Sequence, residues 1–136
     1  EEKAGGVDIE TRVVTMDSFL PVGIAGQVGL VKLDVEGHEA ACLSGMRRLI
    51  ETNRPVVIFE CIHRRTAVAI HEQMDPLGYR YFEIDDGTGI IRETTRLDPI
   101  LNDDGSPVST RLNRIATSRD EDAKIILAAG TKRQAG

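Results

Sequence analysis

A dense run of ionisable side chains, residues 32–39, holds the residue types and spacings in this sequence that could do chemistry. The run reads Lys-Leu-Asp-Val-Glu-Gly-His-Glu and follows an apolar stretch. Alternation along a strand places Lys32 and Asp34 on the same face. Asp34 and Glu36 then fall where the strand ends and a helix begins, and the exposed amides of a helix N-terminus favour nearby carboxylates. Gly37 suits a tight turn or the close approach of a ligand to the backbone.

The same run also has a purely structural interpretation. In that interpretation Asp34 and Glu36 cap the following helix, and Lys32 pairs with an acid. A metal site or a hydrolase built on Asp34, Glu36 and His38 is disfavoured, because the adjacent residues His38 and Glu39 diverge by about 100° on a helix. Metal ligands must converge on one point, so we expect no metal site.

Composition and charge exclude several classes of protein. The chain has 136 residues, of which 40% are hydrophobic and 29% charged, and this predicts one soluble globular domain. With 17 basic and 22 acidic residues, its net charge of −5 argues against a nucleic-acid partner. No apolar run reaches the roughly 18 residues needed to span a bilayer, and the polar first residues lack a signal-peptide pattern. We therefore expect a cytoplasmic protein without a membrane partner. Cys42 and Cys61 lie in apolar segments and are expected to be free thiols.

The elements that must position these residues follow from apolar periodicity. Short apolar runs predict strands at residues 11–16, 29–35, 55–62, 79–84 and 112–117. Spacings of three and four residues predict one helix through Leu43, Met46, Leu49 and Ile50, and a second through Ala67, Ile70, His71 and Met74. Residues 90–92 are expected to pair back as a hairpin, 93–110 to form a polar loop, and 123–129 a short helix. The glycine-spaced segment 23–29 is expected to be a loop, because a strand follows it rather than precedes it.

Strands that alternate with helices predict an α/β sandwich with a parallel sheet. The continuous apolar run at 55–62 suits a parallel strand that is covered on both faces. Ligands of such sheets bind beyond the carboxyl ends of the strands, which directs attention to residues 34–39, 60–64 and 85–89. We divide the chain into an N-terminal segment (1–29), a main body (30–119) and a C-terminal tail (120–136).

The run at residues 32–39 resembles the K-[IL]-D-[VI]-E-G-x-E signature of FkbM-type S-adenosylmethionine-dependent methyltransferases. The flanking segments agree with further motifs of that family. Residues 13–20 resemble its T-L-D-x-L segment, 43–45 its L-x-G, 54–60 its R-P-x-[IV]-x-x-E strand and 77–79 its L-G-Y. The matches keep the order of the family across residues 13–82.

The resemblance implies a Rossmann-like methyltransferase fold, which is a three-layer sandwich with strand order 3-2-1-4-5-7-6. This chain would supply strands 4-5-7-6, a partial sheet that is mostly parallel with one antiparallel strand. Residues 30–34 would be strand 4, 55–62 strand 5, 79–84 strand 6 and 112–117 strand 7.

The resemblance also implies methyl transfer from S-adenosylmethionine, usually to a hydroxyl oxygen of a small molecule or sugar. Asp34, Lys32 and His63 are the implied catalytic residues. Asp34 and Glu36 would contact the cofactor, and Glu60 and His63 the acceptor. A histidine titrates near neutral pH, which suits His63 to remove the acceptor proton. A solvent-facing loop position is the alternative role for His63.

One part of the family pattern is not found. Its cofactor-binding half carries a glycine-rich turn and an acidic residue ahead of strand 4, and the 29 residues before Leu30 contain neither in the required context. We therefore expect the C-terminal, acceptor-side portion of a methyltransferase, which needs the other half for normal cofactor affinity. The open edge of strand 4 would pair with a second copy or with a complementing N-terminal half. The alternative is a non-catalytic interaction module that uses this edge for assembly.

Overall fold

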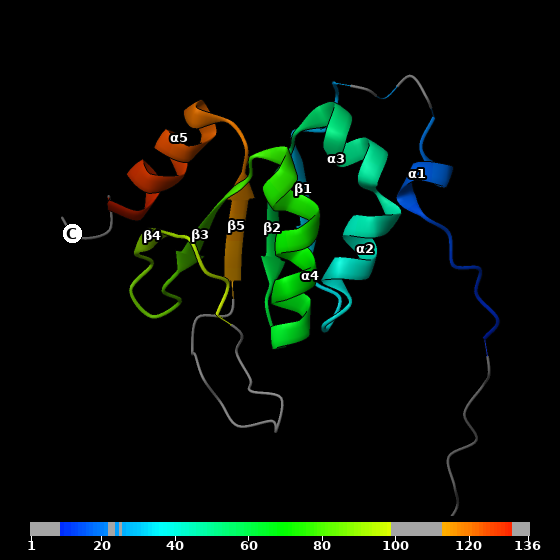
Figure 1. The fold of residues 1–136 in the computed structure, drawn as a ribbon, viewed down its shortest axis with the longest axis horizontal. Coiled ribbons are helices and arrows are strands. Elements are labelled where there is room, and N and C mark those ends of the chain that lie inside the picture. The colour runs from blue at the N-terminus through cyan, green and yellow to red at the C-terminus, as the bar shows by residue number, and fades with distance from the viewer. Residues whose placement is uncertain (1–8, 22–23, 25, 99–112, 132–136) are drawn as a thin grey trace, which may run out of the picture.

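A five-stranded sheet with helices on both faces forms the body of the protein (Figure 1). The computed structural model describes residues 9–21, 24, 26–98 and 113–131. Its elements, in chain order, are α1 (Met16–Phe19), β1 (Leu30–Leu33), α2 (Glu39–Gly45), α3 (Arg47–Asn53), β2 (Val56–Glu60), α4 (Arg64–Met74), the 3₁₀ turn η2 (Asp75–Leu77), β3 (Arg80–Ile84), β4 (Ile91–Thr94), β5 (Asn113–Thr117) and α5 (Asp120–Thr131). Most of the predicted 93–110 loop, part of the glycine-spaced segment 23–29, and residue 112 of the last predicted strand lie outside the described residues.

The strands are ordered β1-β2-β5-β3-β4. The first four keep the order that the family resemblance implies. The pairing differs from the expectation: β1 and β2 are parallel, whereas the β2–β5, β5–β3 and β3–β4 pairs are antiparallel. The mostly parallel character that the resemblance implies is therefore not confirmed, although β1, β2 and β3 share one direction and β5, the implied antiparallel strand, is reversed. β5 runs between two strands of the opposite direction, so one reversed strand makes two antiparallel pairs, and the β3–β4 hairpin adds a third.

Two apolar cores form because the inner strands are apolar on both faces. In β2, Val57 and Phe59 are fully buried towards α2, α3 and α4. Val56 and Ile58 alternate with them and pack in the second core, which lies beneath α5. The molecule therefore has three layers, with α2, α3 and α4 on one face of the sheet and α5 on the other. Burial of an apolar side chain of this size contributes about 1.5–3 kcal/mol.

The single helix predicted through Leu43 and Ile50 is in fact two helices. The chain bends at Met46, whose φ of −126° and ψ of 25° depart from helical values. The buried apolar face continues across the bend, so the spacing alone does not reveal it. Asp17 supplies the missing cap from the N-terminal segment: its carboxylate accepts the amides of Arg48 (2.8 Å) and Leu49 (3.0 Å) at the start of α3.

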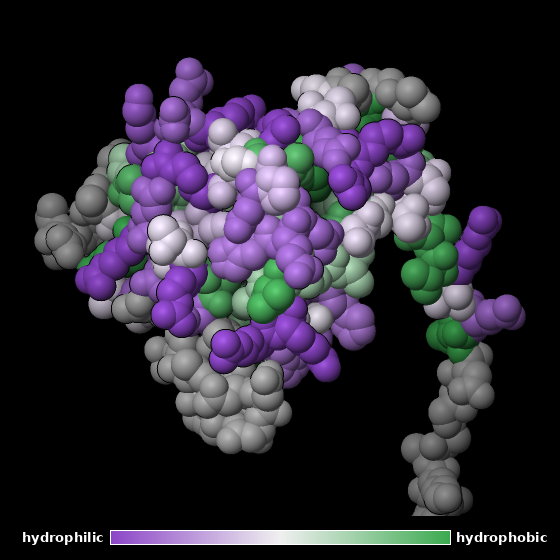
Figure 2. Space-filling view, viewed as in Figure 1, coloured by the Kyte–Doolittle hydropathy of each residue, from purple (hydrophilic) through white to green (hydrophobic). Residues whose placement is uncertain are grey.

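The N-terminal segment has no strand where one was predicted at residues 11–16. It is extended up to Thr15, whose hydroxyl accepts the amide of Ser18 and caps α1. Without a neighbouring strand the β-prone residues here remain solvent-exposed, as with Val13 (93% exposed) and Phe19 (72%). Figure 2 shows hydrophobic residues standing clear of the body along this segment.

The C-terminal elements cover the second face of the sheet. β4 pairs with β3 as a hairpin, as predicted, and α5 packs on β4 and β5. Gly130 makes the contact close, since a β-carbon there would lie 2.6 Å from the amide nitrogen of Ile91. The opposite edge of the sheet is less covered by helices, and Leu30 on β1 is 58% exposed there. Among the described residues, no helix is both long and apolar enough to cross a lipid bilayer.

Candidate functional site

A left-handed turn joins β1 to α2 and shapes the charged run. Glu36 and Gly37 both have positive φ, at 51° and 91°, and the amide of His38 donates to the carbonyl of Val35 across 3.2 Å. Positive φ at both central residues is typical of a type I′ turn. Residues that carry a side chain seldom adopt this conformation, and where they do they tend to gather at functional sites. The turn lies just beyond the carboxyl end of β1.

A cleft of about 380 Å³ opens between this turn and the N-terminal end of α4. Alanines of α2 and α4 form part of its wall, and their small side chains leave the space open. The polar residues that line it are Glu36, His38, His63, Arg65 and Thr66. The imidazole of His63, just before α4, and the carboxylate of Glu36, on the β1–α2 turn, therefore both line this cleft.

His63 immediately precedes α4, and its backbone is extended, with φ −119° and ψ 149°. Its ring lies against Gly37, because a β-carbon added at Gly37 would be 3.4 Å from Cδ2 of the imidazole. A β-carbon there would be in ordinary contact with the ring, so it is the positive φ of 91° that favours glycine at this position. The structure thus brings together Glu36 and His63, two of the predicted site residues, on one cleft.

Lys32, Asp34 and Glu60 form a second group. Nζ of Lys32 lies 2.6 Å from Oδ2 of Asp34, and the two side chains are 55% and 54% exposed. Lys32 alternates with buried Leu33, and Glu60 with buried Phe59, so both belong to the sheet face opposite α2 and α4. None of the three lines the cleft. The predicted site residues are therefore divided between the two faces at the ends of β1 and β2.

The two groups nevertheless share one electrostatic environment. Burial raises the pKa of Glu60 above its ordinary value. The carboxylates of Asp34, Glu36 and Glu39 raise the pKa further, while the Lys32 ammonium lowers it. The ends of β1 and β2 thus carry a concentration of negative charge with Lys32 as the basic group that acts on Glu60.

The turn at residues 85–89 lies on the same edge of the sheet. Nδ2 of Asn113 donates to Oδ1 of Asp86 across 3.2 Å, and Asn113 pairs with Glu60 in the sheet. The 85–89 turn follows the carboxyl end of β3, as predicted. No residue of this turn lines the cleft.

Three buried polar residues at this edge were not among the predicted site residues. Glu39, at the start of α2, is fully buried, and its Oε1 accepts the amide of Gly37 across 3.2 Å. Thr66, on α4, is 4% exposed and donates to the carbonyl of Gly37 across 3.4 Å. Arg114, on β5, is 1% exposed and donates to the carbonyl of Asp98. For Arg114 the sequence held a signal: alternation around it predicts that it points to the same face as Ala116.

Cys61 is a buried free thiol, as predicted. Burial raises its pKa to about 11, and the nearby Arg114 guanidinium opposes that effect. A thiol with this pKa is almost wholly protonated at neutral pH and is a poor nucleophile. Cys42, half-buried on α2, is also free.

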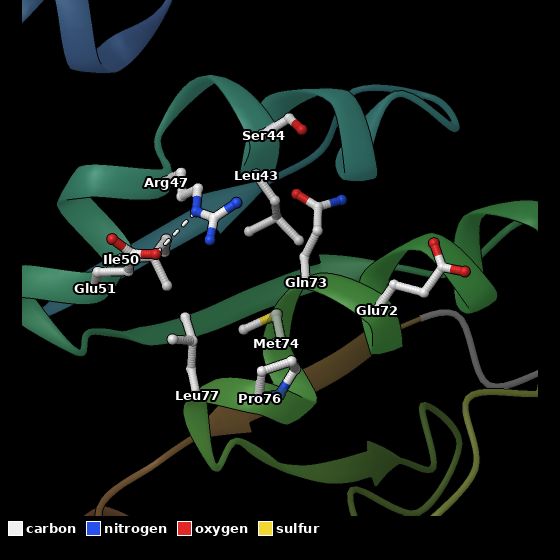
Figure 3. A pocket seen from close by; sticks show the side chains of 10 residues that line it. All are labelled: Leu43, Ser44, Arg47, Ile50, Glu51, Glu72, Gln73, Met74, Pro76 and Leu77. Atoms are coloured by element: carbon white, nitrogen blue, oxygen red, sulfur yellow. Dashed lines mark hydrogen bonds and ion pairs between the residues drawn. The ribbon is translucent and has the colours of Figure 1, made fainter.

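A second pocket, of about 130 Å³, lies between α2–α3 and the end of α4 (Figure 3). Leu43, Ile50, Met74 and Leu77 provide its apolar surface, and Arg47 pairs with Glu51 at its edge, Nε to Oε1 2.8 Å. It contains no residue that the sequence analysis assigned to the site. It is a gap between packed helices rather than a convergence of reactive groups.

Potential metal ligands do not gather here. Within residues 9–21, 24, 26–98 and 113–131, no three histidine, cysteine, aspartate or glutamate side chains are arranged to hold a metal ion.

The comparison with protein families identifies the domain to which these residues belong. The model of the methyltransferase FkbM domain matches residues 1–81, a span that includes the β1–α2 turn, both strand ends and the start of α4. No curated protein and no solved structure matches the chain. The family model covers more than half of the chain, so this protein belongs to the FkbM methyltransferase domain family.

Proposed function

We propose that this protein transfers a methyl group from S-adenosylmethionine to a hydroxyl oxygen of a small molecule or sugar, and that these residues form the acceptor side of the site. The family match over residues 1–81 carries the proposal, because it spans both the left-handed turn and His63. The position of the cleft supports it, since open α/β sheets bind ligands beyond the carboxyl ends of their strands. Its volume of about 380 Å³ is within the range of small-molecule sites.

The charges at the site fit one end of the cofactor. S-adenosylmethionine, when bound, supplies a methyl group carried on a positively charged sulfur. The carboxylates of Asp34 and Glu36 would hold the positively charged methionine end. Burial is the main cause of the raised pKa of Glu60, and the charges of these two carboxylates raise it further. Among the residues that the structure describes, no glycine-rich turn joins a strand to a following helix in the way that would receive the adenosine end.

The chain's own residues would then handle the acceptor. The cleft would hold the acceptor hydroxyl oxygen where the bound cofactor could supply its methyl group. His63 takes the hydroxyl proton and passes it to solvent, a role suited to an imidazole near neutral pH. The wall of the cleft orients the acceptor, and Lys32, paired with Asp34 on the other face of the sheet, limits the local negative charge. Alignment of acceptor and donor supplies most of the remaining rate enhancement.

The open edge of β1 supports the proposal that another strand pairs with this sheet. β1 is the terminal strand of the sheet and has β2 as its partner among the described strands. Leu30, the first residue of β1, is 58% exposed. We propose that a strand of a complementing N-terminal half, or of a second copy, pairs here and completes the cofactor side. We also propose that the protein works in the cytoplasm.

The same edge favours one other function. A module that used the β1 edge only to assemble with another protein would also leave Leu30 exposed and would need no cofactor. Titration of the full chain with S-adenosylmethionine by calorimetry separates the two. Methyl transfer predicts saturable binding, weakened by Asp34→Asn and unchanged by Asp120→Asn, which removes another exposed, ion-paired carboxylate, at the start of α5. Absence of binding, with a concentration-dependent dimer in sedimentation, would rule out methyl transfer by these residues alone.

A further inference from the structure

The backbone of Gly37 is held by two buried side chains from two different helices. Oε1 of Glu39, on α2, accepts its amide across 3.2 Å, and Oγ1 of Thr66, on α4, donates to its carbonyl across 3.4 Å. Glu39 is fully buried and Thr66 is 4% exposed. Both hydrogen-bonding groups of one residue are thus tied to the helices that form the cleft.

Packing alone does not explain a carboxyl group in this position. A buried polar group costs free energy unless it is hydrogen-bonded, and Oε2 of Glu39 has no partner among the described residues. An apolar side chain would fill the same space without that cost. The bond from Oε1 to the Gly37 amide is the interaction that an apolar residue could not make.

The backbone at this point needs such support. Glu36 has a φ of 51° although it carries a side chain, and Gly37 has a φ of 91°. Residues in sparsely populated conformations persist where the surrounding structure over-determines them. His38, the residue before α2, makes no side-chain capping bond, and the bond from Glu39 instead holds the turn that leads into this helix.

The supported turn also sets the position of the imidazole. His63 lies against the α-carbon of Gly37, and Glu36 precedes it on the same turn. We infer that Glu39 and Thr66 are positioning residues, which clamp Gly37 between α2 and α4 and thereby fix the separation of Glu36 and His63 across the cleft. The catalytic consequence rests on the proposed function; the clamp itself does not.

The test uses Thr66→Val and Glu39→Ala, with Thr66→Ser and Glu39→Gln as conservative partners. Thr117→Val is the matched control, because Thr117 is also fully buried and donates its hydroxyl to Asp122, on the other side of the molecule near α5. The first readout is the nuclear Overhauser contact between the His63 ring and the Gly37 α-protons. The second is hydrogen exchange of the Gly37 amide.

We expect Thr66→Val and Glu39→Ala to weaken the His63–Gly37 contact, and Glu39→Ala to speed exchange of the Gly37 amide about tenfold through the loss of its acceptor. Serine and glutamine, which keep the hydroxyl and the carbonyl acceptor, should restore both signals. Thr117→Val should leave both unchanged even where it lowers stability. A folded Thr66→Val chain with an unaltered contact, or the same loss in Thr117→Val, would overturn the clamp.

A titration of each variant with S-adenosylmethionine keeps the two proposals apart. If the wild-type chain does not bind while the contact responds as described, the proposed function fails and the clamp stands. If wild type and Thr66→Val bind equally although the contact is lost, the clamp has no part in shaping the site and the inference fails.

Discussion

Replacement of Gly37 by alanine perturbs the β1–α2 turn at its most demanding residue. Its φ of 91° lies in the left-handed region, where a β-carbon costs roughly 1–2 kcal/mol. The added carbon would also lie 3.4 Å from Cδ2 and 3.7 Å from Nε2 of His63, which is at the tight end of ordinary contact. We therefore expect a loss of about 2 kcal/mol in the free energy of unfolding, together with a small displacement of the imidazole.

Two other glycines separate the contributions. Gly78 has a φ of 71° with nothing within 4 Å of an added β-carbon, so Gly78→Ala carries the strain without the contact. Gly29 has open space and no positive φ, so Gly29→Ala should change stability by less than about 0.5 kcal/mol. Urea denaturation of the three variants measures the order, and the His63 ring signals should move in Gly37→Ala alone.

The reasoning would be refuted if Gly37→Ala proved no less stable than Gly29→Ala. In that case the turn is not held in its left-handed conformation in solution. Equal shifts of the His63 signals in Gly78→Ala would refute the contact between the ring and the turn.

Three further predictions concern other parts of the molecule. Asp17→Ala should cost about 1 kcal/mol in urea denaturation, because two amides at the start of α3 lose their acceptor; an unchanged midpoint would contradict the cap. The raised pKa of Glu60 means that the folded state holds the carboxyl proton more tightly than the unfolded state. The contribution of Glu60 to the free energy of unfolding therefore declines as the pH rises above the ordinary pKa of a glutamate. Glu60→Gln should therefore gain stability over wild type between pH 4 and pH 7, and a constant difference would contradict this. With a pKa of about 11, Cys61 should resist alkylation until urea unfolds the chain, whereas half-buried Cys42 should react first.

Much of the fold follows from local patterns. The strands at β1, β2, β3 and β5 follow apolar runs, and the order of these four strands agrees with the family resemblance. The mostly antiparallel pairing does not follow from the alternation of strands and helices, because the one reversed strand, β5, has two partners and the β3–β4 hairpin adds a third antiparallel pair. The bend at Met46 was missed since the buried spacing continues through it, and the cap from Asp17 joins residues that are distant in sequence.

The candidate site was predicted in part. Glu36 and His63 meet on one cleft because each follows one of two adjacent parallel strands. Lys32 and Asp34 lie apart from the cleft, since strand alternation directs them to the other face. The burial of Glu39 was not predicted, because a glutamate in the first turn of a helix is ordinarily exposed there, and only the packing of α2 on α4 covers it.

Chemical-shift mapping with S-adenosylmethionine on the ¹⁵N-labelled chain tests the central claim most directly. The account predicts that the amides of Gly37 and Thr66, at the two walls of the cleft, shift and saturate together, while those of α5 stay in place. Saturable shifts confined to the Leu43–Met74 pocket of Figure 3, or no shifts at any concentration of the cofactor, would contradict it.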